Sequence, residues 1–343
     1  MSHEYRNQQD EKNTEIINQL LDQMPVFAED YYDHLISRGR STNTIKSYLY
    51  EFGVFLRFVA TIVKKESPHE LDISDLDRIN QRQIEKYVAR AENGSALAET
   101  AMRRKLSVVR SVYKYYLGIE AIKTNPTLQM EGARIKEKKV IKLNESQIKS
   151  LLDCIQNQSG VTDHSRAYAE KLVFRDLAIV VVLLGTGMRI SELVGLNVSD
   201  FDLSDPAHPC FHIIRKGGDD DIVYCVPFVK ESLEDYLIYT RPLLLSSDEE
   251  NAMFLSTQKK RMGVNSIEKM MKKYCKAAGL PDNISPHKLR ATFATTVYKQ
   301  TKDIYAVRDS LHHKSIDTSK HYIADQEERK QSAAAAAGSM FGI

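Results

Sequence analysis

The last half of the chain holds the residues whose types and spacing are best suited to chemistry. Arg189 lies on a glycine-marked turn, Arg290 follows His287 by three residues, and Tyr322 follows His313 by nine. Guanidinium groups match phosphate oxygens bidentately and stay charged, and a tyrosine hydroxyl can act as a nucleophile in a cationic site. Together these residues predict a site that holds a phosphodiester and attacks it without a metal.

Each of these residues also has an ordinary structural explanation. The chain has 17 tyrosines, and a phenol with its usual pKa of about 10 is a poor nucleophile unless cations surround it. Arg189 can form a salt bridge with Glu192, three residues later, and that carboxylate could at the same time hold the arginine in place. The residues are candidates because they occur together, and any one of them alone would mean little.

The histidines near the second arginine suit proton transfer. At the start of a helix His287 and Arg290 face the same side, and an imidazole can move a proton near neutral pH. His313 can donate a hydrogen bond to a phosphate oxygen. We expect His312 and His321 to be exposed helix residues.

Lys216 lies on a glycine-containing turn between two β-rich runs, 210–214 and 222–226, which is the pattern of a hairpin. A lysine on a flexible turn can reach into a groove and protonate a leaving oxygen. An exposed turn lysine without a role is the more frequent case, so the hairpin alone does not assign Lys216 a function.

Other chemistries lack their sequence signatures. The glycine turn before Arg189 has neither the lysine and serine of a phosphate-binding loop nor the spacing of a dinucleotide fingerprint. No Gly-x-Ser-x-Gly elbow is present. We expect no metal site, because no histidine cluster has a recognisable zinc spacing and no Cys-x-x-Cys pair occurs. The cysteines are scattered: Cys154, Cys210, Cys225 and Cys275.

A net charge of +2 conceals a strongly basic stretch. Residues 100–142 carry eleven lysines and arginines against three glutamates, a net charge of +8. Such a block suits a polyanion such as DNA, because each neutralised phosphate releases condensed counterions. A solvated helix face followed by a charged linker explains it equally well. The chain shows no membrane-spanning run and no secretory signal, so we expect a cytoplasmic protein.

The pattern of apolar residues predicts a mainly helical protein of two domains, with a small antiparallel sheet in the second. The first domain is expected to be all-α and the second α+β. The predicted boundaries are a helical extension at 1–26, a helical domain at 27–118, a basic linker at 119–142, a second domain at 143–330 and an alanine-rich tail at 331–343.

Helices are expected wherever apolar residues recur at helical spacing between capping or breaking residues. They cover 14–24 in the helical extension and 44–62, 81–91 and 99–116 in the first domain, with a shorter apolar stripe at 31–36. In the second domain they cover 169–184, 190–195, 230–245, 264–278, 289–299 and 304–311.

With these residues in order, the chain resembles the tyrosine recombinase (phage integrase/Xer-like) family over about residues 27–330. The motif around Arg189 and Glu192, the hairpin lysine, the His287-x-x-Arg290 pair, and the late histidine and tyrosine match in type, order and spacing. Residues 41–48 and 104–113 are similar to that family's helical core-binding domain, which precedes its α+β catalytic domain.

The resemblance implies roles for these residues. Tyr322 would attack the scissile phosphate and form a 3′-phosphotyrosine, leaving a free 5′-hydroxyl. The remaining roles are phosphate binding by Arg189, Arg290 and His313, general acid catalysis by Lys216, assistance from His287 and support from Glu192. The covalent link conserves bond energy, so neither a metal nor another cofactor is implied.

The resemblance also implies the partners. Four protomers would act on two DNA duplexes with inverted-repeat sites and exchange strands through a Holliday junction. Arg103, Arg104, Arg110 and Lys46 are the expected DNA-binding residues. In this family such tails often dock on a neighbouring subunit, although a frayed terminus is equally consistent with residues 331–343.

Two positions depart from the family's usual pattern, since His312 stands where glycine is usual and Ala291 where histidine is frequent. The expected role is Xer-like resolution of chromosome dimers. The alternatives are the integrase of a mobile element, a non-catalytic DNA-binding protein that retains the fold, and a type IB topoisomerase, which uses similar chemistry.

Overall fold

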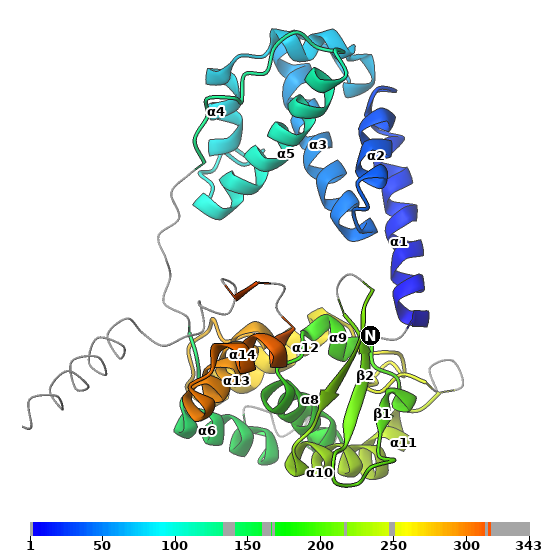
Figure 1. Cartoon of the computed structure of the whole chain (residues 1–343), viewed down its shortest axis with the longest axis vertical. Coiled ribbons are helices and arrows are strands. Elements are labelled where there is room, and N and C mark those ends of the chain that lie inside the picture. The colour runs from blue at the N-terminus through cyan, green and yellow to red at the C-terminus, as the bar shows by residue number, and fades with distance from the viewer. Residues whose placement is uncertain are drawn as a thin grey trace, which may run out of the picture. The chain divides into compact units, whose positions relative to one another are not determined.

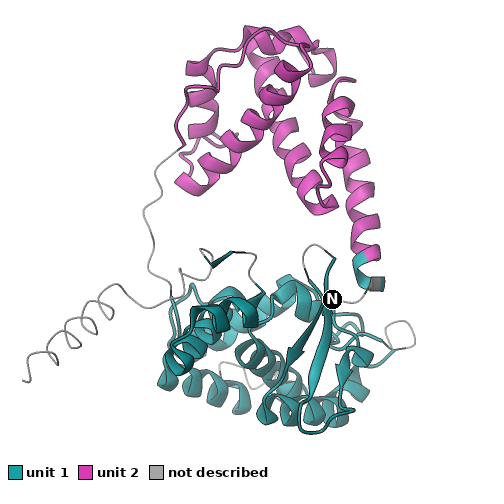
Figure 2. Cartoon of the chain, viewed as in Figure 1, with its two compact units in different colours: residues 1–6, 138–343 teal, residues 7–137 magenta. Residues whose placement is uncertain are grey.

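The computed structural model describes residues 3–132, 141–159, 166, 169–215, 218–246, 251–312 and 315–316. The chain forms two compact units, here called the N-terminal unit (7–137) and the C-terminal unit (1–6 and 138–343). Figure 1 labels the elements and Figure 2 colours the two units. The domain boundaries proposed from the sequence stay predictions.

The N-terminal unit is entirely helical among its described residues, apart from one isolated bridge between Arg90 and Ala96. Ser41 caps the longest helix through its side chain, and Asn80 forms a capping box with Gln83. The helices are α1 (His3–Leu21), α2 (Ala28–Ser37), α3 (Thr42–Val63), α4 (Gln81–Ala89) and α5 (Glu99–Gly118), with short 3-10 turns η1 (Pro68–Glu70) and η2 (Ile73–Arg78).

Aromatic and aliphatic side chains from α2 to α5 form the core of this unit. Tyr31, Phe52, Phe55, Tyr113 and Tyr116 are all at most 1% exposed. Because the hydrophobic effect scales with the apolar area removed from water, these large side chains supply much of the unit's stability.

The C-terminal unit surrounds a central apolar helix, α8 (Val173–Thr186), whose residues 177–183 are nearly all fully buried. The other helices are α6 (Glu145–Gln156), α9 (Ile190–Val194), α10 (Pro227–Asp235), α11 (Arg241–Leu244), α12 (Val264–Ala277), α13 (Pro286–Thr301) and α14 (Ile304–Leu311), with the 3-10 turn η3 (Val198–Asp200) and the π-helical segment η4 (Tyr236–Thr240).

A three-stranded antiparallel sheet lies against this core, in the order β1-β2-β3. The strands are β1 (Phe201–Asp202), β2 (Cys210–Ile214) and β3 (Asp220–Tyr224). Phe211, Ile213 and Val223 face the core, while His212, Ile222 and Tyr224 are exposed on the other face. The mainly helical fold with a small antiparallel sheet confirms the predicted fold class.

The structure differs from the sequence-based expectation in several elements. The first helix, expected over 14–24, spans His3–Leu21. The expected helix over 230–245 is helical up to Leu244, but a π segment interrupts it before Pro242, whose ring cannot pack against the carbonyl four residues earlier in a regular α-helix. Helix α13 begins at Pro286, three residues earlier than expected, since proline suits the first helical position. Strand β1 has only two residues and shows no recognisable sequence pattern.

Within the described ranges, every helix is too short or too polar to span a lipid bilayer.

Candidate active site

The turn between α8 and α9 places Arg189 at the start of a helix. Gly187 ends α8 with a φ of +62°, and a Cβ there would lie 2.3 Å from Cδ1 of Phe293, so both backbone and packing require glycine. The backbone N–H of Arg189 then donates to Oε2 of Glu192 at 2.7 Å. Its guanidinium donates to Oε1 of the same carboxylate at 2.8 Å, and 28% of the side chain stays exposed.

Glu192 also binds a second arginine, which the sequence did not assign to the site. Nη1 of Arg215, at the end of β2, donates to Oε2 of Glu192 at 2.9 Å. Nε of Arg215 donates to Oδ2 of Asp221, on β3, at 2.6 Å. In the sequence Arg215 is only a turn residue and Asp221 only part of an acidic run. The alternation of buried and exposed positions along a hairpin is the one signal that could have found them.

Arg290 is 3% exposed and joins the turn before Arg189 to the end of α14. Its Nη1 donates to the carbonyl of Gly187 at 2.5 Å and its Nη2 to the carbonyl of Leu311 at 2.7 Å. Arg290 is thus tied to the turn that carries Arg189, and Glu192 holds the side chain of Arg189. Two guanidinium groups held in this way can stabilise the charge of a phosphate and of its pentavalent transition state.

The electrostatics of Glu192 follow from its surroundings. Its side chain is 2% exposed, and this burial by itself would raise the pKa of its carboxyl. Arg215 and the hydrogen bonds from Arg189 outweigh that effect, so the pKa lies below its ordinary value. Glu192 therefore stays ionised and can hold both guanidinium groups at neutral pH.

Of the remaining predicted catalytic residues, the structure describes His287. His287 occupies the first turn of α13, three residues before Arg290, and its side chain is exposed. Lys216, His313 and Tyr322 lie outside the described residues. Their immediate neighbours Arg215 and His312 are described, and both contact Asp221.

Five buried tyrosines of the described chain are poor nucleophiles. Burial raises the pKa of Tyr236 to about 12 and raises the pKa values of Tyr31, Tyr113, Tyr116 and Tyr274 further above their ordinary value. Each of these hydroxyls donates a hydrogen bond inside the fold. These tyrosines serve packing and are unsuited to attack on a phosphate.

One face of α5 in the N-terminal unit is lined with the predicted DNA-binding arginines. Thr100, Arg103, Arg104, Ser107 and Arg110 recur at spacings of three and four residues and line a single hollow with Gly132. Arg103 and Arg104 are exposed, and Arg110 is half-buried and donates to the carbonyl of Met130. The hollow therefore presents two exposed guanidinium groups and two hydroxyls.

Lys46, the fourth expected DNA-binding residue, is half-buried at the start of α3. Its Nζ donates to Oδ1 of Asn13 on α1 at 2.5 Å, and Asn13 also donates to the hydroxyl of Thr42 at 3.2 Å. These contacts anchor α1 against α3, so Lys46 has a structural role in the described chain in addition to any contact with DNA.

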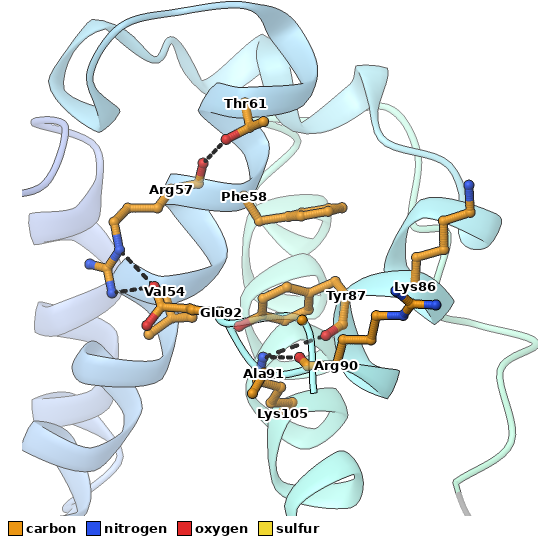
Figure 3. Close-up of a pocket in the computed structure, with 11 residues that line it drawn as sticks. Val54, Arg57, Phe58, Thr61, Lys86, Tyr87, Arg90, Ala91, Glu92 and Lys105 are labelled. Atoms are coloured by element: carbon orange, nitrogen blue, oxygen red, sulfur yellow. Dashed lines mark hydrogen bonds and ion pairs between the residues drawn. The ribbon is translucent and has the colours of Figure 1, made fainter. Parts of the chain in front are cut away.

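A second hollow of the N-terminal unit shows that one basic residue of the +8 stretch belongs to the fold (Figure 3). Lys105 is 8% exposed, lies 4.1 Å from the centre of the Tyr87 ring and donates to the carbonyl of Arg90 at 3.0 Å. Burial lowers its pKa. Lys105 thus caps the end of α4 and does not face a polyanion.

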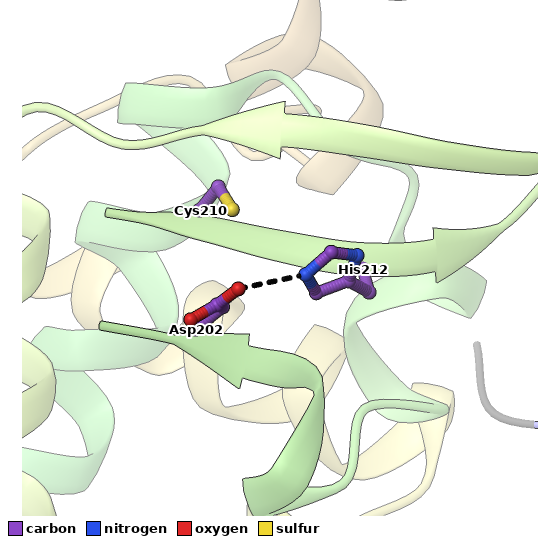
Figure 4. A group of neighbouring side chains, drawn as sticks. All are labelled: Asp202, Cys210 and His212. Atoms are coloured by element: carbon purple, nitrogen blue, oxygen red, sulfur yellow. Dashed lines mark hydrogen bonds and ion pairs between the residues drawn. The ribbon is translucent and has the colours of Figure 1, made fainter. Parts of the chain in front are cut away.

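Among the described residues, one group offers three different metal-ligand types: Asp202, Cys210 and His212, on neighbouring strands (Figure 4). Nε2 of His212 already contacts Oδ2 of Asp202 at 3.1 Å. Burial, together with Asp202 and Asp205, raises the pKa of the Cys210 thiol and so disfavours the thiolate that binds metals. The geometry favours a histidine–carboxylate pair at this position.

Two family models match most of the chain. The model of the phage integrase family matches residues 142–329, and that of the phage integrase N-terminal SAM-like domain matches residues 28–117. The first match includes the turn of Arg189, the sheet and α13.

Individual relatives give the same result. Tyrosine recombinase XerS of Streptococcus agalactiae serotype III (strain NEM316) is 27% identical, over 91% of this chain and 96% of its own. Tyrosine recombinase XerC of Caldanaerobacter subterraneus subsp. tengcongensis is 30% identical, over 87% and 82%. The solved Tn1549 transposon integrase in complex with circular intermediate DNA shares the fold, with a TM-score of 0.65 and 18% identity over 90% of this chain and 99% of that one. The chain therefore belongs to the phage integrase family of tyrosine recombinases.

Proposed function

We propose that this recombinase cleaves and rejoins DNA at specific sites through a covalent bond to Tyr322. The observation that carries the proposal is the turn at Gly187, to whose carbonyl Arg290 donates and after which Glu192 holds Arg189 in place. Two fixed guanidinium groups form a phosphate-binding site that a protein with only a structural salt bridge would not need.

In the proposed reaction, the phenol oxygen of Tyr322 bonds to the scissile phosphorus and the bond from phosphorus to the 5′-oxygen breaks. Lys216 gives a proton to that leaving oxygen, and His287 assists proton transfer. Arg189, Arg290 and His313 bind the non-bridging oxygens. The reverse attack by a 5′-hydroxyl on the phosphotyrosine rejoins a strand, and no cofactor enters the balance.

The exposed arginines of α5 support a DNA contact by the N-terminal unit. Arg103 and Arg104 are proposed to bind backbone phosphates. Arg110 and Lys46 each make a contact inside the fold and are proposed to contact DNA as well. Phosphate contacts of this kind position a protein on DNA without specifying sequence.

The biological role is proposed to be Xer-like resolution of chromosome dimers, in the cytoplasm, by four protomers on two duplexes with inverted-repeat sites. The names of XerS and XerC, which match nearly whole chains, support this role. The shared fold with a transposon integrase supports the second candidate, integration of a mobile element. Deletion of the gene distinguishes the two, because only loss of dimer resolution would leave unsegregated chromosomes.

A nicked suicide substrate tests the chemistry. The wild-type protein is expected to form a covalent complex with the labelled strand once the short 5′-fragment diffuses away, whereas Tyr322→Phe should bind the same DNA and form none. Binding by both proteins without a covalent product would instead indicate a non-catalytic DNA-binding protein. Relaxation of supercoils without exchange of strands would indicate a topoisomerase.

A further inference from the structure

His312 adopts a backbone conformation that normally belongs to glycine. It ends α14 with a φ of +51°, in the left-handed region that a side chain with a Cβ disfavours. Its Nδ1 lies 2.9 Å from Oδ2 of Asp221 on β3. An imidazole retained at this position therefore makes a contact across two elements that glycine could not make.

The contact completes a closed ring of interactions around the phosphate-binding turn. From Arg189 the ring runs through Glu192, Arg215 and Asp221 to His312, at distances of 2.8, 2.9, 2.6 and 2.9 Å. The neighbouring residue Leu311 accepts a hydrogen bond from Arg290, which also donates to Gly187, two residues before Arg189.

We propose that His312 and Asp221 are positioning residues, which close this ring and so fix Arg189 and Arg290 relative to each other. The inference rests on the proposed function, because it assigns both arginines to the phosphate. His312 lies one residue before His313 and Asp221 five residues after Lys216, so the same pair also anchors the segments that carry those two residues.

The exposed fractions of His312 and Asp221 allow an effect on positioning to be distinguished from an effect on folding stability. The His312 side chain is 51% exposed and that of Asp221 12% exposed. A polar contact with one well-exposed partner contributes little to folding stability. Removing the imidazole should therefore leave the fold intact and even relieve the backbone, while the link between β3 and α14 is lost.

Three variants of the full-length protein test this. His312→Gly removes the imidazole and suits the backbone. His312→Asn also tolerates the left-handed conformation and keeps a donor for Asp221. Lys302→Gly is the matched control, since Lys302 ends α13 with a φ of +56° and is exposed. For each, single-turnover cleavage of the suicide substrate is measured at saturating protein, with DNA affinity and urea unfolding alongside.

His312→Gly is expected to cleave about tenfold more slowly, a loss of about 1.4 kcal/mol of transition-state stabilisation. Its DNA affinity should stay within about twofold, because phosphate binding is assigned here to other residues than this pair. His312→Asn should retain most of the rate and Lys302→Gly all of it. Asp221→Asn should slow cleavage similarly, and combining it with His312→Gly should add little, as expected for coupled residues.

Cleavage by His312→Gly at the wild-type rate would overturn the inference, and so would a loss of rate that merely follows a loss of stability in urea. Failure of the wild-type protein itself to form a covalent complex would instead overturn the proposed function, so the two failures are distinguishable.

Discussion

Glu192 is the carboxylate on which the proposed phosphate site depends. It is almost fully buried and is shared by Arg189 and Arg215, so the group carries one negative charge between two positive ones. Burying such a group is costly unless its partners are in place, and removing one partner leaves an uncompensated charge. Asp221 pairs with the other side of Arg215 at 2.6 Å, so within this group two arginines and two carboxylates balance in charge.

Replacing Glu192 by glutamine should destabilise the C-terminal unit by about 3 kcal/mol at pH 7, because two arginines lose their shared counter-charge. The pKa of Glu192 is lowered in the folded state, so its contribution is present above the ordinary value of 4.5 and is lost as the pH falls below it. Urea unfolding should therefore show a large difference between wild type and Glu192→Gln at pH 7 that shrinks towards pH 3. A difference independent of pH would show that the carboxylate's charge is not responsible.

Gly187→Ala should cost about 2–4 kcal/mol, since it combines a left-handed backbone with a clash against the Phe293 ring. Gly279→Ala is the control, because Gly279 has a φ of +65° but a Cβ there would meet nothing within 4 Å. This substitution should lower the free energy of unfolding by only about 1 kcal/mol. Thermal unfolding of both variants measures the difference. Equal losses would mean that Phe293 moves aside without penalty.

At the scale of elements, α5 has two faces with different functions. Arg103 and Arg104 are exposed on one, while Lys105, the next residue, is buried beneath Tyr87 on the other. Three consecutive basic residues in the sequence therefore divide between a proposed DNA contact and a structural cap.

Arg104→Ala should weaken DNA binding and reduce the dependence of log affinity on log salt by about 0.9 for each phosphate that the variant no longer neutralises. Lys105→Met removes the same charge from the adjacent position. It should lower stability but leave the salt dependence unchanged, because this lysine contacts the protein. Titrations of labelled duplex at several salt concentrations provide the measurement, and equal slopes for both variants would argue against the assigned faces.

Elements of this kind were largely predictable from the sequence. The spacing of apolar residues located most helices and the β2–β3 hairpin, because helical and strand periodicities are local properties. Arg189, Glu192, His287 and Arg290 were named as candidates through their motifs. The structure places Glu192 against Arg189, and Arg290 against the turn that precedes Arg189. The partnership of Arg215 with Glu192, and of Asp221 with His312, was not predicted, since it joins residues 23 and 91 positions apart whose types have many ordinary uses. The π segment and β1 were not predicted, because neither produces a characteristic spacing of apolar residues in the sequence.

At the scale of the whole molecule, the described chain has two large hydrophobic cores. One draws its buried residues from the N-terminal unit and the other from the C-terminal unit, and the two share no residue. Each core is of a size that supports independent folding.

The two cores should give two unfolding transitions. Phe52→Ala creates a cavity in the first core and should lower only one transition, while Phe254→Ala should lower only the other, each by about 3–5 kcal/mol. Differential scanning calorimetry resolves the two. A single transition that shifts with either substitution would show that the units unfold as one.

The buried phenols described above also set an upper pH limit for the fold. Their pKa values lie above the ordinary value of 10.0, so the folded protein keeps protons that an unfolded chain would release. Stability is therefore retained below about pH 10 and falls as alkali is added. The ultraviolet absorbance of phenolate should rise first for the surface tyrosines. It should then rise abruptly for the interior ones, when alkali unfolds the cores in which they are buried.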